Sequence, residues 1–172
     1  MGARTKARKR ALDILFESEL RGLDTGATLA GRREAVDALN SYTVTLVEGV
    51  VAHRDEIDEL LGAHSEAWPL ERMPAVDRNL LRIGVFELRY VDEVPDAVAM
   101  SEAVSLAREL STDESPAFVN GLLAKIAGLP AVAPHEQETE DTQVEPPTLP
   151  DEQLTSRVTP GLGDDRDAAL PS

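Results

Sequence analysis

The sequence of 172 residues contains no cysteine, which excludes disulfide bridges and thiolate metal sites. A chain of this kind suits the reducing cytoplasm. Aromatic residues are scarce too, with three phenylalanines, two tyrosines and one tryptophan. No apolar run approaches the roughly 18 residues that a membrane span needs, and the basic N-terminus lacks the apolar stretch of a secretory signal. We therefore expect a cytoplasmic protein with one folded domain and no membrane association.

Positive charge is also in short supply, but it is concentrated in one place. The chain has 17 lysines and arginines against 32 acidic residues, which gives a net charge of −15. Residues 1–10 nevertheless hold five cations and no acid. Because so acidic a protein should repel nucleic acid in general, this basic segment stands out as a localised site for an anion.

The folded part of the chain is predicted to end near residue 128. Seven of the eleven prolines lie between residues 130 and 171, and all six aromatic residues lie at or before residue 118. A proline-rich, acidic segment with few apolar residues cannot bury enough surface to offset its ordering entropy. The sequence therefore predicts a folded domain over residues 1–128 and a disordered acidic tail over residues 129–172.

Apolar residues recur at helical spacing throughout the predicted domain. The segment 75–91 is apolar nearly all round, which predicts a central and deeply buried helix. Asp96 and Ser115 are the expected N-caps of the last two helices. The apolar face of the first helix is expected to comprise Leu12, Leu15, Phe16, Leu20 and Leu23. We predict an all-α fold, a compact single-domain bundle of six to seven helices, with helices over 3–22, 28–39, 41–61, 75–91, 97–110 and 116–127.

The sequence shows no constellation typical of a catalytic or metal site. A di-iron site in a helical bundle needs a glutamate three positions before each histidine, and neither His53 nor His64 has one; the third histidine, His135, lies in the tail. The predicted domain also lacks a glycine-rich phosphate loop. We therefore expect no catalytic residues, no metal, no cofactor and no enzymatic activity.

Five cations occupy the first turns of the first predicted helix, namely Arg4, Lys6, Arg8, Lys9 and Arg10. Cations at a helix N-terminus oppose the helix macrodipole, so folding gives no reason to place them there. An external polyanion does give a reason, since the helix N-terminus and the cations both attract phosphate. The competing interpretation is a solvated N-terminus that only aids solubility. Phe16, further along the same helix, either stacks on an unpaired base or belongs to the core.

Four phrases occur in the order and at the spacing seen in NusB proteins: KARKRALDILFESEL, VDRNLLRIGVFELRY, VPDAVAMSEAVSLARELS and SPAFVNGLLAKIA. The chain therefore resembles the NusB family over residues 3–128. The resemblance implies a helical bundle that acts in transcription antitermination. Such a protein binds single-stranded boxA RNA of ribosomal RNA operons together with the ribosomal protein NusE, within an RNA polymerase elongation complex that contains other Nus factors.

The resemblance also implies roles for individual residues. The basic first helix would meet RNA phosphates, Phe16 would reach a base, and Phe118 would complete the RNA surface. Ala117 stands where relatives can carry a lysine, which removes one phosphate contact. Asp77, expected at the exposed start of the central helix beside Arg78, matches an acidic position at the NusE contact. The sequence allows a second interpretation of each residue. Phe118 can equally be an ordinary core residue, and Asp77 can be an acid that the helix dipole favours in the first turn.

Two other functions remain compatible with the sequence. Similar helical domains precede the catalytic domain in some RNA cytosine methyltransferases, although only the acidic tail follows here. A self-associating structural protein is the second alternative, because the resemblance also implies a tendency to form a homodimer that hides the RNA surface.

Overall fold

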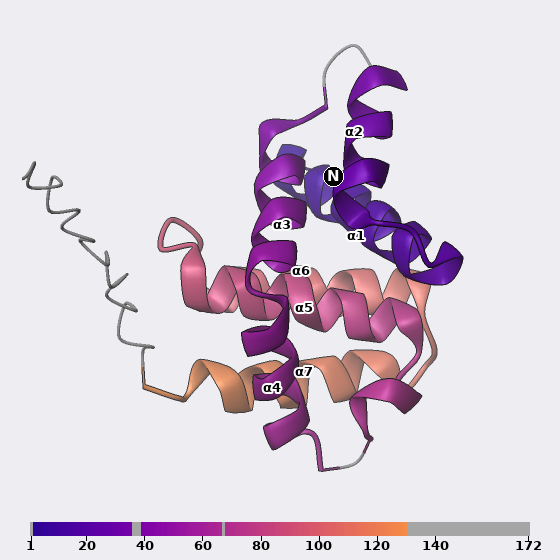
Figure 1. Ribbon diagram of the computed structural model, residues 1–172. Coiled ribbons are helices and arrows are strands. Elements are labelled where there is room, and N and C mark those ends of the chain that lie inside the picture. The colour runs from indigo at the N-terminus through magenta and orange to yellow at the C-terminus, as the bar shows by residue number, and fades with distance from the viewer. Residues whose placement is uncertain (1, 36–38, 67, 131–172) are drawn as a thin grey trace, which may run out of the picture. The chain divides into compact units, whose positions relative to one another are not determined.

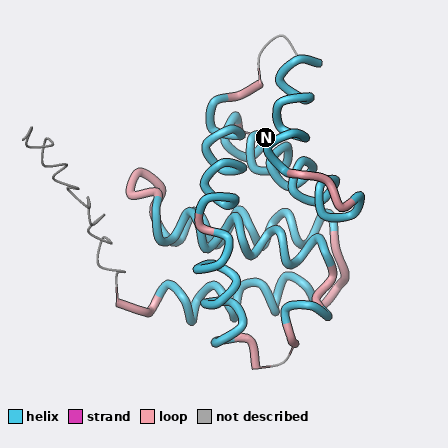
Figure 2. The backbone as a smooth tube through the Cα atoms, in the orientation of Figure 1, coloured by secondary structure: helices cyan, strands magenta, loops and turns pink. Residues whose placement is uncertain are grey.

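The computed structural model describes residues 2–35, 39–66 and 68–130. The acidic tail predicted over 129–172 lies outside the described residues from position 131 onward. Within the described part, the chain forms seven α-helices, one 3-10 turn and no strand (Figures 1 and 2), which confirms the predicted all-α bundle. In chain order these elements are α1 (Ala3–Arg21), α2 (Thr25–Ala35), α3 (Ser41–Ala52), α4 (Arg54–His64), η1 (Leu70–Arg72), α5 (Ala75–Tyr90), α6 (Asp96–Leu110) and α7 (Ser115–Ala127).

The first helix ends at Gly22, which adopts a left-handed conformation with φ 62° and ψ 34°. Glycine is the residue that adopts this conformation without steric cost, so the predicted end of the helix is confirmed. The predicted apolar face is right for Leu12 and Leu15, which are buried, and wrong for Leu20 and Leu23, which are 71% and 50% exposed. At 3.6 residues per turn, Leu20 projects well away from the buried side of α1, and Leu23 lies beyond the end of the helix.

Helix starts were predicted less well than helix bodies. The carboxylate of Asp24 accepts a hydrogen bond from the backbone N–H of Ala27 at 2.8 Å, so α2 begins at Thr25, three residues before its predicted start. The N-caps predicted at Asp96 and Ser115 are wrong, because each is the first residue of its helix instead. Several neighbouring residues can cap each helix, so the sequence predicts the first helical residue only to within a few positions.

The helix predicted over residues 41–61 is in fact two helices, α3 and α4, which meet at His53. The His53 ring stacks on Tyr90 of α5, with the ring centroids 3.9 Å apart. Ile57 and Leu61 of α4 are both fully buried. One apolar stripe continues through both helices, and neither proline nor glycine stands at the join. Periodicity alone could therefore not reveal the break.

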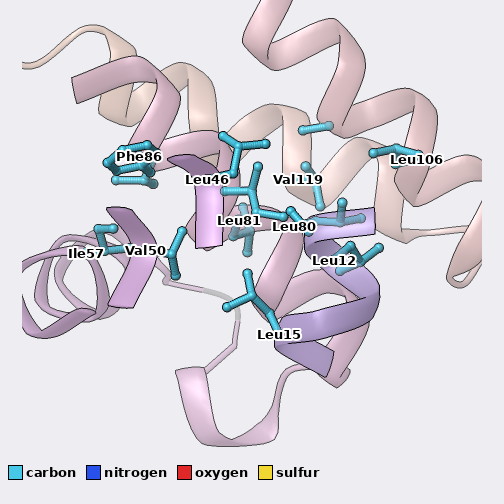
Figure 3. Packing of buried hydrophobic residues seen from close by; sticks show 14 of the residues in the cluster. Leu12, Leu15, Leu46, Val50, Ile57, Leu80, Leu81, Phe86, Leu106 and Val119 are labelled. Atoms are coloured by element: carbon cyan, nitrogen blue, oxygen red, sulfur yellow. The ribbon is translucent and has the colours of Figure 1, made fainter. Parts of the chain in front are cut away.

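The predicted central helix is confirmed as α5, which packs against α1, α3, α4, α6 and α7. Every residue from Asn79 to Glu87 is buried. Figure 3 shows side chains of α5 among those of the surrounding helices, with Leu80, Leu81 and Phe86 labelled. The apolar side chains of α5 join the core, and its buried polar side chains Asn79, Arg82 and Glu87 are hydrogen-bonded to neighbouring helices.

Helices α3 and α5 approach each other closely where Gly49 meets the ring of Phe86. A Cβ atom added to Gly49 would lie 2.0 Å from Cζ of Phe86. Carbon atoms in contact normally lie about 3.5–4.0 Å apart, so no larger side chain fits unless the helices or the ring move. Glycine is thus required here by the neighbouring helix.

Replacing Gly49 by alanine should destabilise the domain by about 1–3 kcal/mol through overpacking, although alanine favours a helix by about 1 kcal/mol. Gly31→Ala in α2 is the matched control, because its new Cβ would meet nothing within 4 Å. We expect the control to stabilise the domain slightly. Urea unfolding followed by circular dichroism measures both changes, and equal effects at the two sites would contradict the close approach of α3 and α5.

Candidate nucleic-acid interface

The five predicted cations lie in the first turns of α1, where no acidic residue occurs. Successive side chains on a helix point about 100° apart, so neighbouring cations face different surroundings. Burial and contacts divide them into one that is enclosed in the fold, two that have an acidic partner at the surface, and two that face solvent.

Arg8 is enclosed in the fold and only 2% exposed. Its Nε donates to both carboxylate oxygens of Glu87 at 3.0 and 2.9 Å, and its Nη2 donates to Oε1 at 2.7 Å. Nη1 lies 3.3 Å from Glu102 on α6, and Tyr42 on α3 donates its hydroxyl to Glu87. Burial lowers the pKa of Arg8, but the hydrogen bonds and the charge of Glu87, together with Tyr42 and Glu102, outweigh burial and raise the pKa. The expectation that Arg8 meets RNA phosphate is therefore corrected: its charge is neutralised inside the fold.

Arg4 and Lys9 each have an acidic partner at the surface. Nη2 of Arg4 lies 3.5 Å from a carboxylate oxygen of Glu93, and its guanidinium lies 5.2 Å from the centre of the Tyr42 ring. Nζ of Lys9 pairs with Glu109 on α6. Exposed pairs of this kind typically contribute about 0.2–1 kcal/mol, so an incoming phosphate can displace the carboxylate at little cost.

Lys6 and Arg10 lie one helical turn apart and are both exposed. Among the described residues, neither has a carboxylate within ion-pair distance. Both line a hollow of about 370 Å³ whose far side is formed by Leu39, Asn40 and Thr43, at the start of α3. These two cations are the best placed of the five to receive an external anion.

The two predicted aromatic residues are both partly exposed. Phe118 packs edge-on against Trp68, with ring centroids 5.5 Å apart and the planes at 84°. It also lines a hollow of about 240 Å³ together with His64 and Lys125. Phe118 belongs to α7, which packs on α4, α5 and α6, whereas α1 packs on α2, α3 and α5. The predicted RNA residues therefore lie on two helices, α1 and α7, which both pack on α5. Lys9 of α1 also pairs with Glu109 of α6.

Asp77 and Arg78, predicted to contact a protein partner, are engaged inside the fold. The expectation that Asp77 lies exposed is wrong, because it is 0% exposed and its Oδ2 accepts a hydrogen bond from Ser115 at 2.6 Å. Arg78 pairs with Glu19 on α1 and donates to the backbone carbonyl of Leu70 at 2.8 Å. Asp77 thus joins the start of α5 to α7, and Arg78 joins it to α1. These contacts explain why an acid and a base stand there.

Glu19 gathers three polar side chains of α5 at the other end of α1. It accepts hydrogen bonds from Arg78, from Asn79 at 3.1 Å and from Arg82 at 2.8 Å. Arg82 also donates to Asp58 on α4 at 2.7 and 2.8 Å. Burial raises the pKa of Glu19, but the bonds from Arg78 and its neighbours outweigh burial and hold the pKa below its ordinary value. Sequence reasoning missed this cluster because its members lie some 60 positions apart.

The described part of the chain contains no group of three or more histidine, aspartate or glutamate residues that could hold a metal ion. Its two histidines have other contacts: His64 Nδ1 lies 2.9 Å from the carbonyl of Leu60, and His53 stacks on Tyr90. None of the described helices is both long enough and apolar enough to cross a membrane.

Comparison with known proteins identifies close relatives. The sequence model of the NusB family matches residues 5–128. The transcription antitermination protein NusB of Nocardioides sp. is 61% identical over 127 residues, which are 73% of this chain and 94% of that protein. The solved structure of T. maritima NusB has a TM-score of 0.65 at 30% identity and covers 74% of this chain and 92% of its own. A complex of the antitermination factors NusB and NusE with double-stranded RNA gives 0.64 at 30% identity, covering 72% and 95%.

The buried Arg8–Glu87 pair can be tested by mutation. Arg8→Leu should destabilise the domain by about 3–5 kcal/mol, because it leaves the Glu87 carboxylate buried without its cation. The double variant R8M/E87L should recover most of that loss, since apolar side chains can replace a buried ion pair. Lys9→Ala, which breaks an exposed pair, is the control and should cost no more than about 1 kcal/mol. Chemical unfolding measures all three, and a harmless Arg8→Leu would show that the pair does not hold α1.

The lowered pKa of Glu19 predicts how the effect of a substitution there depends on pH. A carboxylate whose folded pKa is depressed stabilises the fold above its unfolded pKa, and this contribution is lost as the pH falls through the folded pKa. Glu19→Gln should therefore lower the melting temperature most near neutral pH. The difference from the unchanged protein should shrink below about pH 4, the usual range of a glutamate. A difference that stays constant from pH 7 to pH 3 would contradict the role of the Glu19 charge.

Proposed function

The chain belongs to the NusB family, whose members are non-catalytic transcription antitermination factors, and we propose that it binds single-stranded boxA RNA through the basic end of α1. The RNA is that of ribosomal RNA operons, and binding promotes read-through by RNA polymerase in the cytoplasm. The observation that carries the proposal is the pair of exposed cations Lys6 and Arg10 beside one hollow. In a chain of net charge −15, such a pair is a local exception that suits a phosphate backbone.

Arg4 and Lys9 extend this surface on either side of the pair. Their carboxylate partners are exposed, so the cations can exchange them for RNA phosphates. Arg8 takes no part in phosphate binding under this proposal, because its guanidinium is buried against Glu87. Phe16 and Phe118 remain the proposed contacts for unpaired bases, since both expose part of a ring.

The second proposed partner is the ribosomal protein NusE, within an elongation complex that holds other Nus factors. Support comes from the similar NusB that was solved with NusE and RNA. A few cations provide only modest and salt-sensitive affinity. A protein bound beside the RNA would add contacts and raise the effective concentration of each component.

Replacing Lys6 and Arg10 together by alanine should weaken boxA RNA binding and flatten its dependence on salt. Each phosphate contact to a single strand contributes about 0.7 to the slope of log affinity against log salt concentration, so the slope should fall by about 1.4. Fluorescence anisotropy with labelled boxA RNA, from 50 to 300 mM salt and with and without NusE, measures both quantities.

The matched control is the double variant Arg21→Ala and Arg72→Ala, which removes two exposed cations from the other end of α1 and from η1. We expect it to change the salt slope much less than the loss of Lys6 and Arg10. If the two double variants lose affinity equally, RNA responds only to net charge, and the assignment of the α1 surface is wrong.

A further inference from the structure

A hollow lies between the end of α6 and the start of α7. It has a volume of about 570 Å³ and is open to solvent. Its apolar part comes from Val104 on α6 and from Pro116 and Ala117 on α7. Neither the buried ion pair nor the Lys6 and Arg10 surface makes use of this hollow.

Four polar side chains stand around the apolar part of the hollow: Arg108, Thr112, Asp113 and Asn120. All four are exposed. Arg108, Asp113 and Asn120 make no side-chain hydrogen bond or ion pair to any other described residue. The rim therefore offers a guanidinium donor, a carboxylate acceptor and an amide that both donates and accepts.

This chemistry fits the edge of a nucleobase better than it fits a phosphate. A carboxylate repels phosphate, whereas it accepts hydrogen bonds from base amino groups. Arginine and asparagine form paired hydrogen bonds with base edges, and single-stranded RNA is read through such edges when its bases are unstacked. A mixed rim of Arg108, Asp113 and Asn120 thus favours a neutral ligand with both donors and acceptors.

The hollow lies near both parts of the proposed RNA surface. Glu109, the neighbour of Arg108 on α6, pairs with Lys9 of α1. Ala117 lines this hollow and also the smaller hollow that contains Phe118. The hollow therefore borders the Phe118 hollow, and α6 links it to the basic end of α1.

We propose that the α6–α7 hollow receives one unstacked base of the bound RNA, and that Asn120 and Arg108 determine which base it accepts. This inference rests on the proposed RNA-binding function and deepens it, because it assigns sequence selectivity to a place separate from the phosphate contacts. Asn120 is exposed on α7 and makes no side-chain hydrogen bond to any other described residue. Its exposed position on the rim gives it a specific role.

The test uses the full chain and a set of boxA RNAs in which each base is replaced in turn. Asn120→Ala should reduce discrimination at one RNA position by roughly 5- to 150-fold, the range for one well-formed pair of hydrogen bonds to a base. The salt slope should not change, because no phosphate contact is lost. Arg108→Lys should also lose discrimination, since lysine keeps the charge but lacks the planar fork of arginine.

Ser105→Ala is the matched control, because Ser105 is exposed on α6 but does not line the hollow. All variants are expected to keep the melting temperature of the unchanged protein, since each replaces an exposed side chain. The control should discriminate among the RNAs as the unchanged protein does.

Three results would overturn the inference. Asn120→Ala and Arg108→Lys could discriminate as well as the unchanged chain, or they could lose affinity equally for every RNA with a flatter salt slope, which indicates a phosphate contact. They could also bind RNA normally and lose NusE, which would make the hollow a protein-binding site. In all three cases the unchanged protein still binds RNA through Lys6 and Arg10, so the proposed function survives. If the unchanged chain binds no boxA RNA, the proposed function fails and the inference fails with it.

Discussion

The buried ion pair between Arg8 and Glu87 determines how the basic end of α1 sits in the fold. Tyr42 from α3 donates to the same carboxylate, and Glu102 from α6 lies against the same guanidinium, so residues of four helices meet there. Two buried charges are tolerated only when their hydrogen bonds are well satisfied, and three close bonds join this pair. The pair fixes the rotation of α1, and Lys6 and Arg10 face solvent as a consequence.

This arrangement shows what sequence patterns can and cannot predict. The all-α fold and the central position of α5 follow from apolar periodicity, which is a local property. The burial of Arg8 does not follow from apolar periodicity. Nothing in the sequence distinguishes Arg8 from the other four cations, because its partner Glu87 lies 79 positions away. The same limit applies to the break at His53, which stacks on Tyr90 from α5, and to Asp77, which is enclosed by Ser115 from α7.

Under the proposed function, the acidity of the rest of the chain makes the remaining cations selective. A uniformly basic protein binds any polyanion, whereas this one carries a net charge of −15 and exposes few cations close together. Weak, localised attraction to phosphate then needs support from base contacts and from a second protein. Family membership supplies the class of function, and the contacts of individual side chains separate the buried cation Arg8 from the exposed cations that we propose bind RNA. Sequence likeness alone could not make that division.

The central claim is this division of roles among neighbouring cations, and nuclear magnetic resonance tests it directly. In a titration of isotope-labelled full chain with boxA RNA, the side-chain signals of Lys6 and Arg10 should shift. The Nε–H signal of Arg8, which reports its hydrogen bonds to Glu87, should stay in place. A shift at Arg8 with no change at Lys6 and Arg10 would contradict the account.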